Sequence, residues 1–128
     1  MSRLVVDSDI LIDVMHGVEV TLHRLEQEEK HSKLVISSIT KKELLQGCAN
    51  KREWKAVTKF ISSFPIMYLT EEVDIIADNL LERYCLSHGL QIGDALIAAT
   101  AISFNYPLIS KNQKDYRFIE ELALLVYP

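Results

Sequence analysis

The sequence is poor in the residues that mark several well-known classes of protein. It has two cysteines, Cys48 and Cys85, and neither has a histidine at the spacing of a zinc site. We expect both to be reduced packing residues within helices. Four glycines do not form a glycine-rich phosphate-binding loop, and no Ser-His-Asp order of a hydrolase is present. These absences argue against zinc-binding, disulfide-rich and P-loop proteins.

Long apolar runs and an excess of positive charge are also missing. No stretch approaches the ~20 apolar residues of a membrane span, and the start MSRLVVDSD lacks the apolar core of a signal peptide. We therefore expect a cytoplasmic protein with no membrane partner. The net charge is -4 and the pI is near 5.5, which excludes a globally basic nucleic-acid coat. A nucleic-acid substrate would need a local basic patch, a bound metal, or both.

The four histidines do not suggest a catalytic site. His16, His23 and His31 lie in the first third of the chain, and His88 precedes Gly89. All four stand near expected helix ends. We expect surface or capping roles for them.

Short apolar runs alternate with amphipathic segments along most of the chain. Runs typical of strands cover residues 4–6, 34–36, 66–69, 107–109 and 122–127. Helical patterns begin near residue 10 and cover residues 18–30, 37–47, 51–64, 71–86 and 93–104. This alternation predicts a single α/β domain over residues 1–128. It should be a three-layer α/β/α sandwich with a mainly parallel sheet of four to five strands.

The opening strand is the most informative stretch. Leu4, Val5 and Val6 show no polar alternation, which predicts a central strand covered on both faces. Asp7 follows this strand directly. Open α/β sheets bind their ligands at the carboxyl ends of such strands, so Asp7 is a candidate site residue.

Each further carboxylate also has a purely structural explanation. Asp7 or Asp9 would cap the helix that follows, and Glu43 completes a capping box with Thr40. Asp94 precedes an apolar run and would be a helix N-cap. Asn112 and Asp115 would bond to their own loop backbone. We expect three other acidic residues on solvated helix faces: Asp13, Asp74 and Asp78.

The placement of the acidic residues favours a common site. In a doubly wound sheet, residues that follow the first, second and fourth strands gather at one edge, which would bring Asp7, Glu43 and Asp115 together. Asp94 opens the helix that leads to the fourth strand. Converging carboxylates repel one another unless a cation or proton lies among them, and oxygen-only ligands suit Mg²⁺ or Mn²⁺.

Four segments together resemble the PIN-domain family, and within it the VapC toxins of toxin–antitoxin systems. They are VVDSDILID, SSITKKELLQG, GDALIAATA and ISKNQKDY. The resemblance covers essentially the whole chain. Tyr116 stands where Phe is frequent in this family, a change that we do not expect to affect the chemistry.

The resemblance implies an Mg²⁺- or Mn²⁺-dependent endoribonuclease that hydrolyses RNA phosphodiester bonds. Its acidic quartet would be Asp7, Glu43, Asp94 and Asp115. We expect Asp7 and Asp94 to bind metal directly, and Glu43 and Asp115 to do so directly or through water. Ser8 and Asn112 would be supporting polar groups. A small antitoxin would inhibit the enzyme, which would form homodimers.

The sequence also allows other functions. Asp7-Ser8-Asp9 resembles the nucleophile and acid of haloacid-dehalogenase-type phosphatases, although the chain is short for that class. A phosphoaspartyl receiver domain would need an aspartate after the third strand, where Tyr68, Leu69 and Thr70 stand. The remaining alternative is a catalytically idle PIN-like module that binds only a protein partner.

Overall fold

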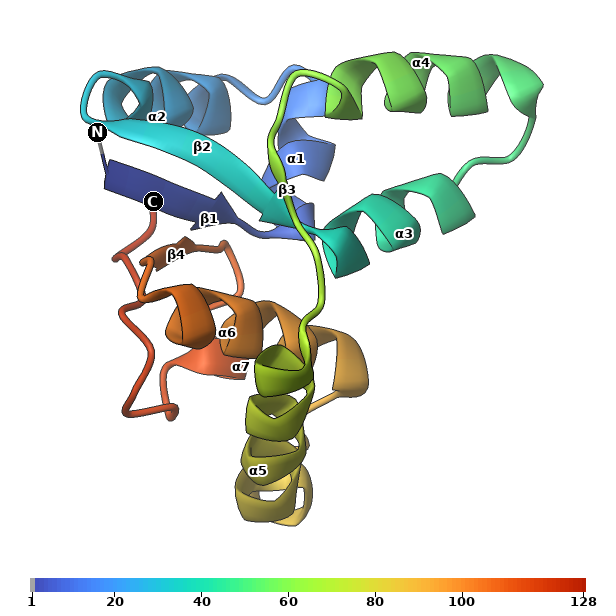
Figure 1. Cartoon of the computed structure of the whole chain (residues 1–128). Coiled ribbons are helices and arrows are strands. Elements are labelled where there is room, and N and C mark those ends of the chain that lie inside the picture. Colours follow the sequence, from blue (N-terminus) through green and yellow to red (C-terminus); the bar gives the residue numbers. More distant parts are fainter. Residues whose placement is uncertain (1) are drawn as a thin grey trace.

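The structure is a computed structural model and describes residues 2–128. Its centre is a four-stranded sheet in which all strands are parallel. The strands are β1 (Ser2–Val6), β2 (Ser32–Ser37), β3 (Ile66–Met67) and β4 (Leu108–Ile109). The helices are α1 (Ser8–Met15), α2 (Glu19–Glu29), α3 (Ser38–Gln46), α4 (Lys51–Ile61), α5 (Glu71–His88), α6 (Ile92–Phe104) and α7 (Gln113–Tyr116). This arrangement confirms the predicted fold class (Figure 1).

The strand order is β3-β2-β1-β4, which makes β1 a central strand as predicted. The chain adds β2 and β3 on one side of β1 and β4 on the other. The direction of winding therefore reverses between β1 and β4, which is where doubly wound sheets bind ligands. Val6 is paired with Ile109, so the residues that follow these two strands leave the sheet side by side.

The sheet separates two hydrophobic cores. Leu4 and Val6 point into a core shared with α1 to α4, whereas Val5 points into a core shared with α5 to α7. Figure 1 shows the two groups of helices on opposite sides of the strands. Because both faces are covered, the strands read as continuous apolar runs.

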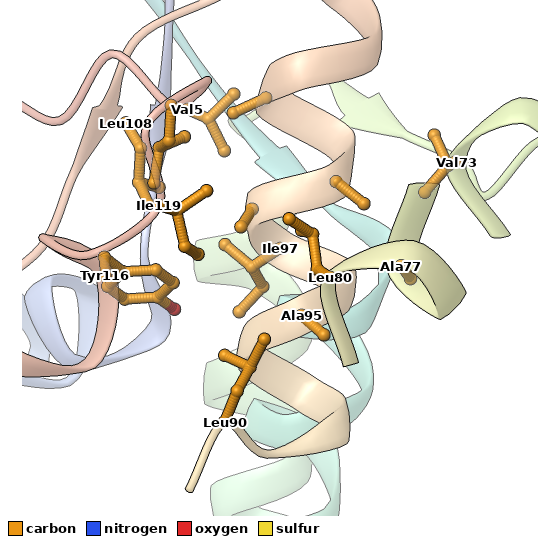
Figure 2. Close-up of a cluster of buried hydrophobic side chains, with 14 of the residues drawn as sticks. Val5, Val73, Ala77, Leu80, Leu90, Ala95, Ile97, Leu108, Tyr116 and Ile119 are labelled. Atoms are coloured by element: carbon orange, nitrogen blue, oxygen red, sulfur yellow. The ribbon is translucent and has the colours of Figure 1, made fainter. Parts of the chain in front are cut away.

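The core on the side of α5 and α6 depends on small side chains. Ala95, Ala98 and Ala99 of α6 are fully buried and let the helix approach the sheet closely. Val73 and Leu80 of α5 pack into the same cluster (Figure 2). The expected buried helix over residues 93–104 is thus confirmed.

Several local predictions are wrong. Residues 122–127 make only an isolated bridge, between Leu124 and Leu108, because β4 itself is two residues long and leaves little backbone to pair with. The expected polar loop after β4 contains the short helix α7. Cys85 is exposed rather than packed; Cys48 is half-buried, and both are free thiols. No helix within residues 2–128 is long and apolar enough to cross a membrane.

Candidate metal centre

The centre of the site is the junction where β1 and β4 end. Asp7 follows β1, is 5% exposed and caps α1, with its Oδ1 accepting a hydrogen bond of 2.8 Å from the Ser8 amide. Ser110 follows β4 and is fully buried. Its hydroxyl donates a 2.7 Å bond to the Asp7 Oδ2. Capping and site geometry are therefore combined in one carboxylate.

Glu43 reaches this junction from α3. The Ser8 hydroxyl donates a 2.7 Å hydrogen bond to Glu43 Oε1 and also lies 3.1 Å from Thr40 Oγ1. The capping-box reading is wrong because α3 begins earlier, at Ser38, with Ser37 as its N-cap. Ser8 thus joins the end of β1 to α3, and its role as a supporting group of the site stays a prediction.

Asp94 comes from the first turn of α6 on the other side of the sheet. It is not the helix cap, since Gln91 occupies that position. The buried Tyr116 hydroxyl donates a 3.1 Å hydrogen bond to Asp94 Oδ1. Asp115 shares with Asp94 the lining of a small notch of about 30 Å³, which also includes His88.

The contact between α3 and α6 is close. A Cβ atom on Gly93 would lie 3.0 Å from the Glu43 Oε2. Glycine at this position leaves room for the Glu43 carboxylate beside Asp94. Three of the four predicted acidic residues are thereby linked across the sheet edge, and Asp115 joins through the notch.

The carboxylates perturb one another. Burial raises the pKa of Asp7 to about 7, with the charge of Asp9 as the next cause. Burial also raises the pKa of Asp94, and the charges of Asp115 and Glu43 contribute. The pKa of Asp9 is raised mainly by burial. Burial is the larger cause and neighbouring carboxylates add to it at Asp7 and Asp94, so a bound cation would favour the ionised forms of these residues.

The donor set fits a hard divalent cation. Asp7, Asp94, Glu43 and Asp115 offer carboxylate oxygens, whereas histidine or cysteine would be expected for zinc. Within residues 2–128, no three acidic, histidine or cysteine side chains form a group that would hold a metal by themselves. Mg²⁺ does not need one, since it usually keeps several waters and binds one or two carboxylates.

The remaining predicted residues have different environments. Asn112 is exposed, and its backbone amide donates a 3.0 Å bond to the Ser110 hydroxyl, while its side chain makes no cap bond. Its supporting role stays a prediction. Asp9 is half-buried within the first turn of α1, so it is not the cap. Its Oδ2 lies 3.4 Å from the Ser110 hydroxyl.

Asp13 is buried, so the prediction that it lies on a solvated helix face is wrong. It is only 9% exposed and binds Lys111 Nζ at 2.9 Å and the Thr21 hydroxyl at 2.9 Å. These two contacts attach the segment after β4 to α1 and α2. Asp74 and Asp78 are exposed on α5, as predicted.

Sequence reasoning missed two residues of the site. Ser110 follows the apolar run 107–109 just as Asp7 follows 4–6, and that pattern was a signal for it. Tyr116 gave no such signal, because an aromatic residue in a polar segment indicates packing. Its hydroxyl donates a hydrogen bond to Asp94, and the expectation that tyrosine in place of phenylalanine leaves the chemistry unaffected stays a prediction.

A separate groove borders the site on the side of α1, α3 and α4. Its volume is about 390 Å³, and its lining is mainly apolar, with Ile12, Met15, Leu44 and Val57. Glu43 stands at its edge and belongs to both features. An apolar segment in this groove would therefore lie next to the acidic residues.

Comparisons with known proteins identify the family of the chain. The PIN domain family model matches residues 4–121. The chain is 34% identical to Ribonuclease VapC1 of Methanocaldococcus jannaschii, over 98% of this chain and 88% of that protein. It is also 34% identical to Ribonuclease VapC10 of Mycobacterium tuberculosis, over 93% of this chain and 90% of that protein.

Solved structures show the same fold. A toxin–antitoxin complex from Klebsiella pneumoniae aligns with a TM-score of 0.79 and 25% identity, covering 96% of both chains. VapBC2 from Rickettsia felis, bound to a DNA fragment from its promoter, aligns with a TM-score of 0.83 and 24% identity. It covers 98% of this chain and 99% of that chain. With a family match over nearly the whole chain and a fold and acidic sheet edge that agree with it, this protein belongs to the PIN domain family.

Proposed function

We propose that this protein is a metal-dependent endoribonuclease that hydrolyses RNA phosphodiester bonds as the toxin of a toxin–antitoxin pair. One observation supports the proposal: four carboxylates from distant parts of the sequence lie near one another at the carboxyl edge of a parallel sheet. They are Asp7, Glu43, Asp94 and Asp115. The similarity to proteins named Ribonuclease VapC supports the choice of RNA as substrate.

Mg²⁺ or Mn²⁺ is the cofactor that we propose for this site. Asp7 and Asp94 would hold it directly, because each has a raised pKa and accepts a hydrogen bond of 2.7 or 3.1 Å from a buried hydroxyl. The cation would supply activation of a water molecule and neutralisation of charge on the phosphate. Ser110 and Ser8 keep Asp7 and Glu43 in place. Glu43 and Asp115 would bind through water or orient the attacking water.

A small antitoxin protein is the partner that we propose. An apolar segment of the antitoxin would occupy the groove lined by Ile12, Met15 and Leu44. Glu43 also lines this groove and would form an ion pair with a basic residue of the antitoxin. The similarity to solved toxin–antitoxin complexes supports such a partner. We also propose that the protein acts in the cytoplasm as a homodimer.

The competing proposal is an inactive PIN-like module that only binds a protein. A ribonuclease assay on structured RNA separates the two proposals, with Mg²⁺ or Mn²⁺ present and with EDTA. We expect cleavage only with metal. Asp7→Asn and Asp94→Asn should each lower the rate at least 100-fold while the circular dichroism spectrum stays unchanged.

Asp74→Asn is the matched control, since it removes one exposed carboxylate from α5. It should cleave at the wild-type rate. Cleavage that survives EDTA, or that is unaffected in Asp7→Asn, would reject the proposed metal-dependent activity. Absence of any cleavage by the wild type with either metal would favour the protein-binding module.

A further inference from the structure

Tyr116 is the largest of the side chains that are fully buried. It comes from α7 and packs its ring into the core formed by α5 and α6. Figure 2 shows its hydroxyl oxygen on the side of the ring that is turned toward α6. The apolar part of the side chain thus closes the core, and its polar end reaches the acidic site.

The buried hydroxyl needs a partner, because a phenol without a hydrogen bond pays the full cost of leaving water. Its partner is Asp94, whose Oδ1 accepts at 3.1 Å. Within residues 2–128, no other group donates a hydrogen bond to this carboxylate. Phenylalanine would fill the same core volume, so the oxygen is the one part of the side chain that serves Asp94 rather than packing.

The ring can hold its hydroxyl in a fixed position. It is fully buried, and it packs in one cluster with Ile97 of α6 and Ile119 of the segment after α7. A side chain confined in this way has lost its rotamer freedom on folding, before any ligand binds. The hydrogen bond to Asp94 is therefore preorganised.

We propose that Tyr116 is a positioning residue that orients the Asp94 carboxylate for the cation, by holding Oδ1 and leaving Oδ2 available. This inference rests on the proposed function, in which Asp94 is a metal ligand. Ser110 does the same for Asp7 from the end of β4, donating to Oδ2 at 2.7 Å. Each of the two direct ligands thus accepts a hydrogen bond from a neutral, buried hydroxyl, and loss of such a donor usually lowers metal affinity. The Tyr116 hydroxyl also lies close to Asp7.

The test is a calorimetric titration of the metal-free protein with Mn²⁺. Tyr116→Phe keeps the ring and removes only the oxygen, so we expect an unchanged circular dichroism spectrum. We expect its Kd for Mn²⁺ to rise roughly 10-fold, the effect usual for loss of a group that orients a metal ligand. In the ribonuclease assay the half-saturating Mn²⁺ concentration should rise to a similar extent, while kcat at saturating Mn²⁺ stays within about threefold of wild type.

Tyr106→Phe is the matched control. Tyr106 is half-buried and stacks on Phe104 near Arg3, at the amino end of β1 and away from the acidic residues. The Kd of the Tyr106→Phe variant for Mn²⁺ should equal that of the wild type. If Tyr116 had a purely structural role, Tyr116→Phe would have a lower melting temperature than the wild type and an unchanged Kd for Mn²⁺. That result would contradict the positioning role.

Asp94→Asn tests the metal-ligand role of Asp94 separately from the positioning role of Tyr116. If Asp94→Asn loses Mn²⁺ binding but Tyr116→Phe binds Mn²⁺ as tightly as the wild type, the positioning role is wrong and the proposed site stands. If Asp94→Asn itself binds Mn²⁺ like the wild type, the assignment of Asp94 as a ligand fails, and the role of Tyr116 fails with it.

Discussion

Asp7 shows how one residue serves both the fold and the site. Its Oδ1 accepts from the Ser8 amide and caps α1, while its Oδ2 accepts from Ser110. These bonds stabilise the carboxylate, but burial outweighs them and raises the pKa of Asp7 to about 7. The fold therefore keeps at its centre an acid that is unfavourable in the absence of a cation.

This leads to a pH dependence of stability for the metal-free protein. From about pH 4 to pH 7 the native state keeps a proton on Asp7 that the unfolded state has released, so the free energy of unfolding falls as the pH rises. The raised pKa values of Asp9 and Asp94 act in the same direction. The Asp7 contribution is on the order of 2–4 kcal/mol. Urea unfolding in EDTA at pH 5, 6, 7 and 8 measures it.

Asp7→Asn is the variant that isolates this effect. It cannot ionise, so its free energy of unfolding should depend less on pH and should exceed that of the wild type at pH 8 by about 1–3 kcal/mol. Asp74→Asn, which removes an exposed carboxylate, should follow the wild-type curve. If the free energies of unfolding of Asp7→Asn and the wild type depend on pH in the same way, the pKa of Asp7 is not raised in the folded protein.

At the scale of the elements, the approach of α3 to α6 decides the geometry of the site. Alanine is the better helix former, so Gly93→Ala should leave the free energy of unfolding unchanged or raise it by about 0.5–1 kcal/mol. The new Cβ would lie 3.0 Å from Glu43 Oε2, so the flexible Glu43 carboxylate must move. We expect the rate of RNA cleavage to fall roughly 10-fold, because Glu43 would be displaced from its place in the site.

Gly47→Ala is the control for this prediction. Gly47 follows α3, and an added Cβ would make only ordinary contacts, 3.5 Å from the Glu43 backbone oxygen. The rate of cleavage should stay at the wild-type value. If Gly93→Ala cleaves RNA as fast as Gly47→Ala does, the position of Glu43 is not important for the reaction.

At the scale of the whole molecule, the sheet joins two cores. Alternate residues of β1 enter opposite cores, so neither core can form without this strand. We propose that residues 1–128 form a single cooperative domain. Calorimetric and van't Hoff enthalpies of thermal unfolding should agree. Two separate transitions would contradict the proposal.

Metal binding should stabilise the whole molecule. A cation that binds only the folded protein adds about 2.7 kcal/mol to the free energy of unfolding at 100 times its Kd. Thermal unfolding with and without Mn²⁺ measures this gain, and Asp94→Asn should abolish it. An equal gain in Asp94→Asn would place the cation elsewhere on the protein.

The sequence by itself determined the architecture and most of the acidic set. Apolar runs without polar alternation predict buried parallel strands, and a carboxylate directly after such a run can lie only at the ligand-binding edge, as for Asp7. These signals are local. They follow from the pleat of a strand and the period of a helix, so they can be read without knowing what packs against them.

Tertiary structure decided which groups act on those carboxylates. Ser110 meets Asp7 because Val6 is paired with Ile109, and Tyr116 meets Asp94 because α7 packs against α6. Asp13 is buried because Lys111 and Thr21 reach it from elsewhere in the chain. These hydrogen-bond partners lie from 8 to 103 positions apart in the sequence. No periodicity in the sequence encodes such contacts, so only the folded chain reveals them.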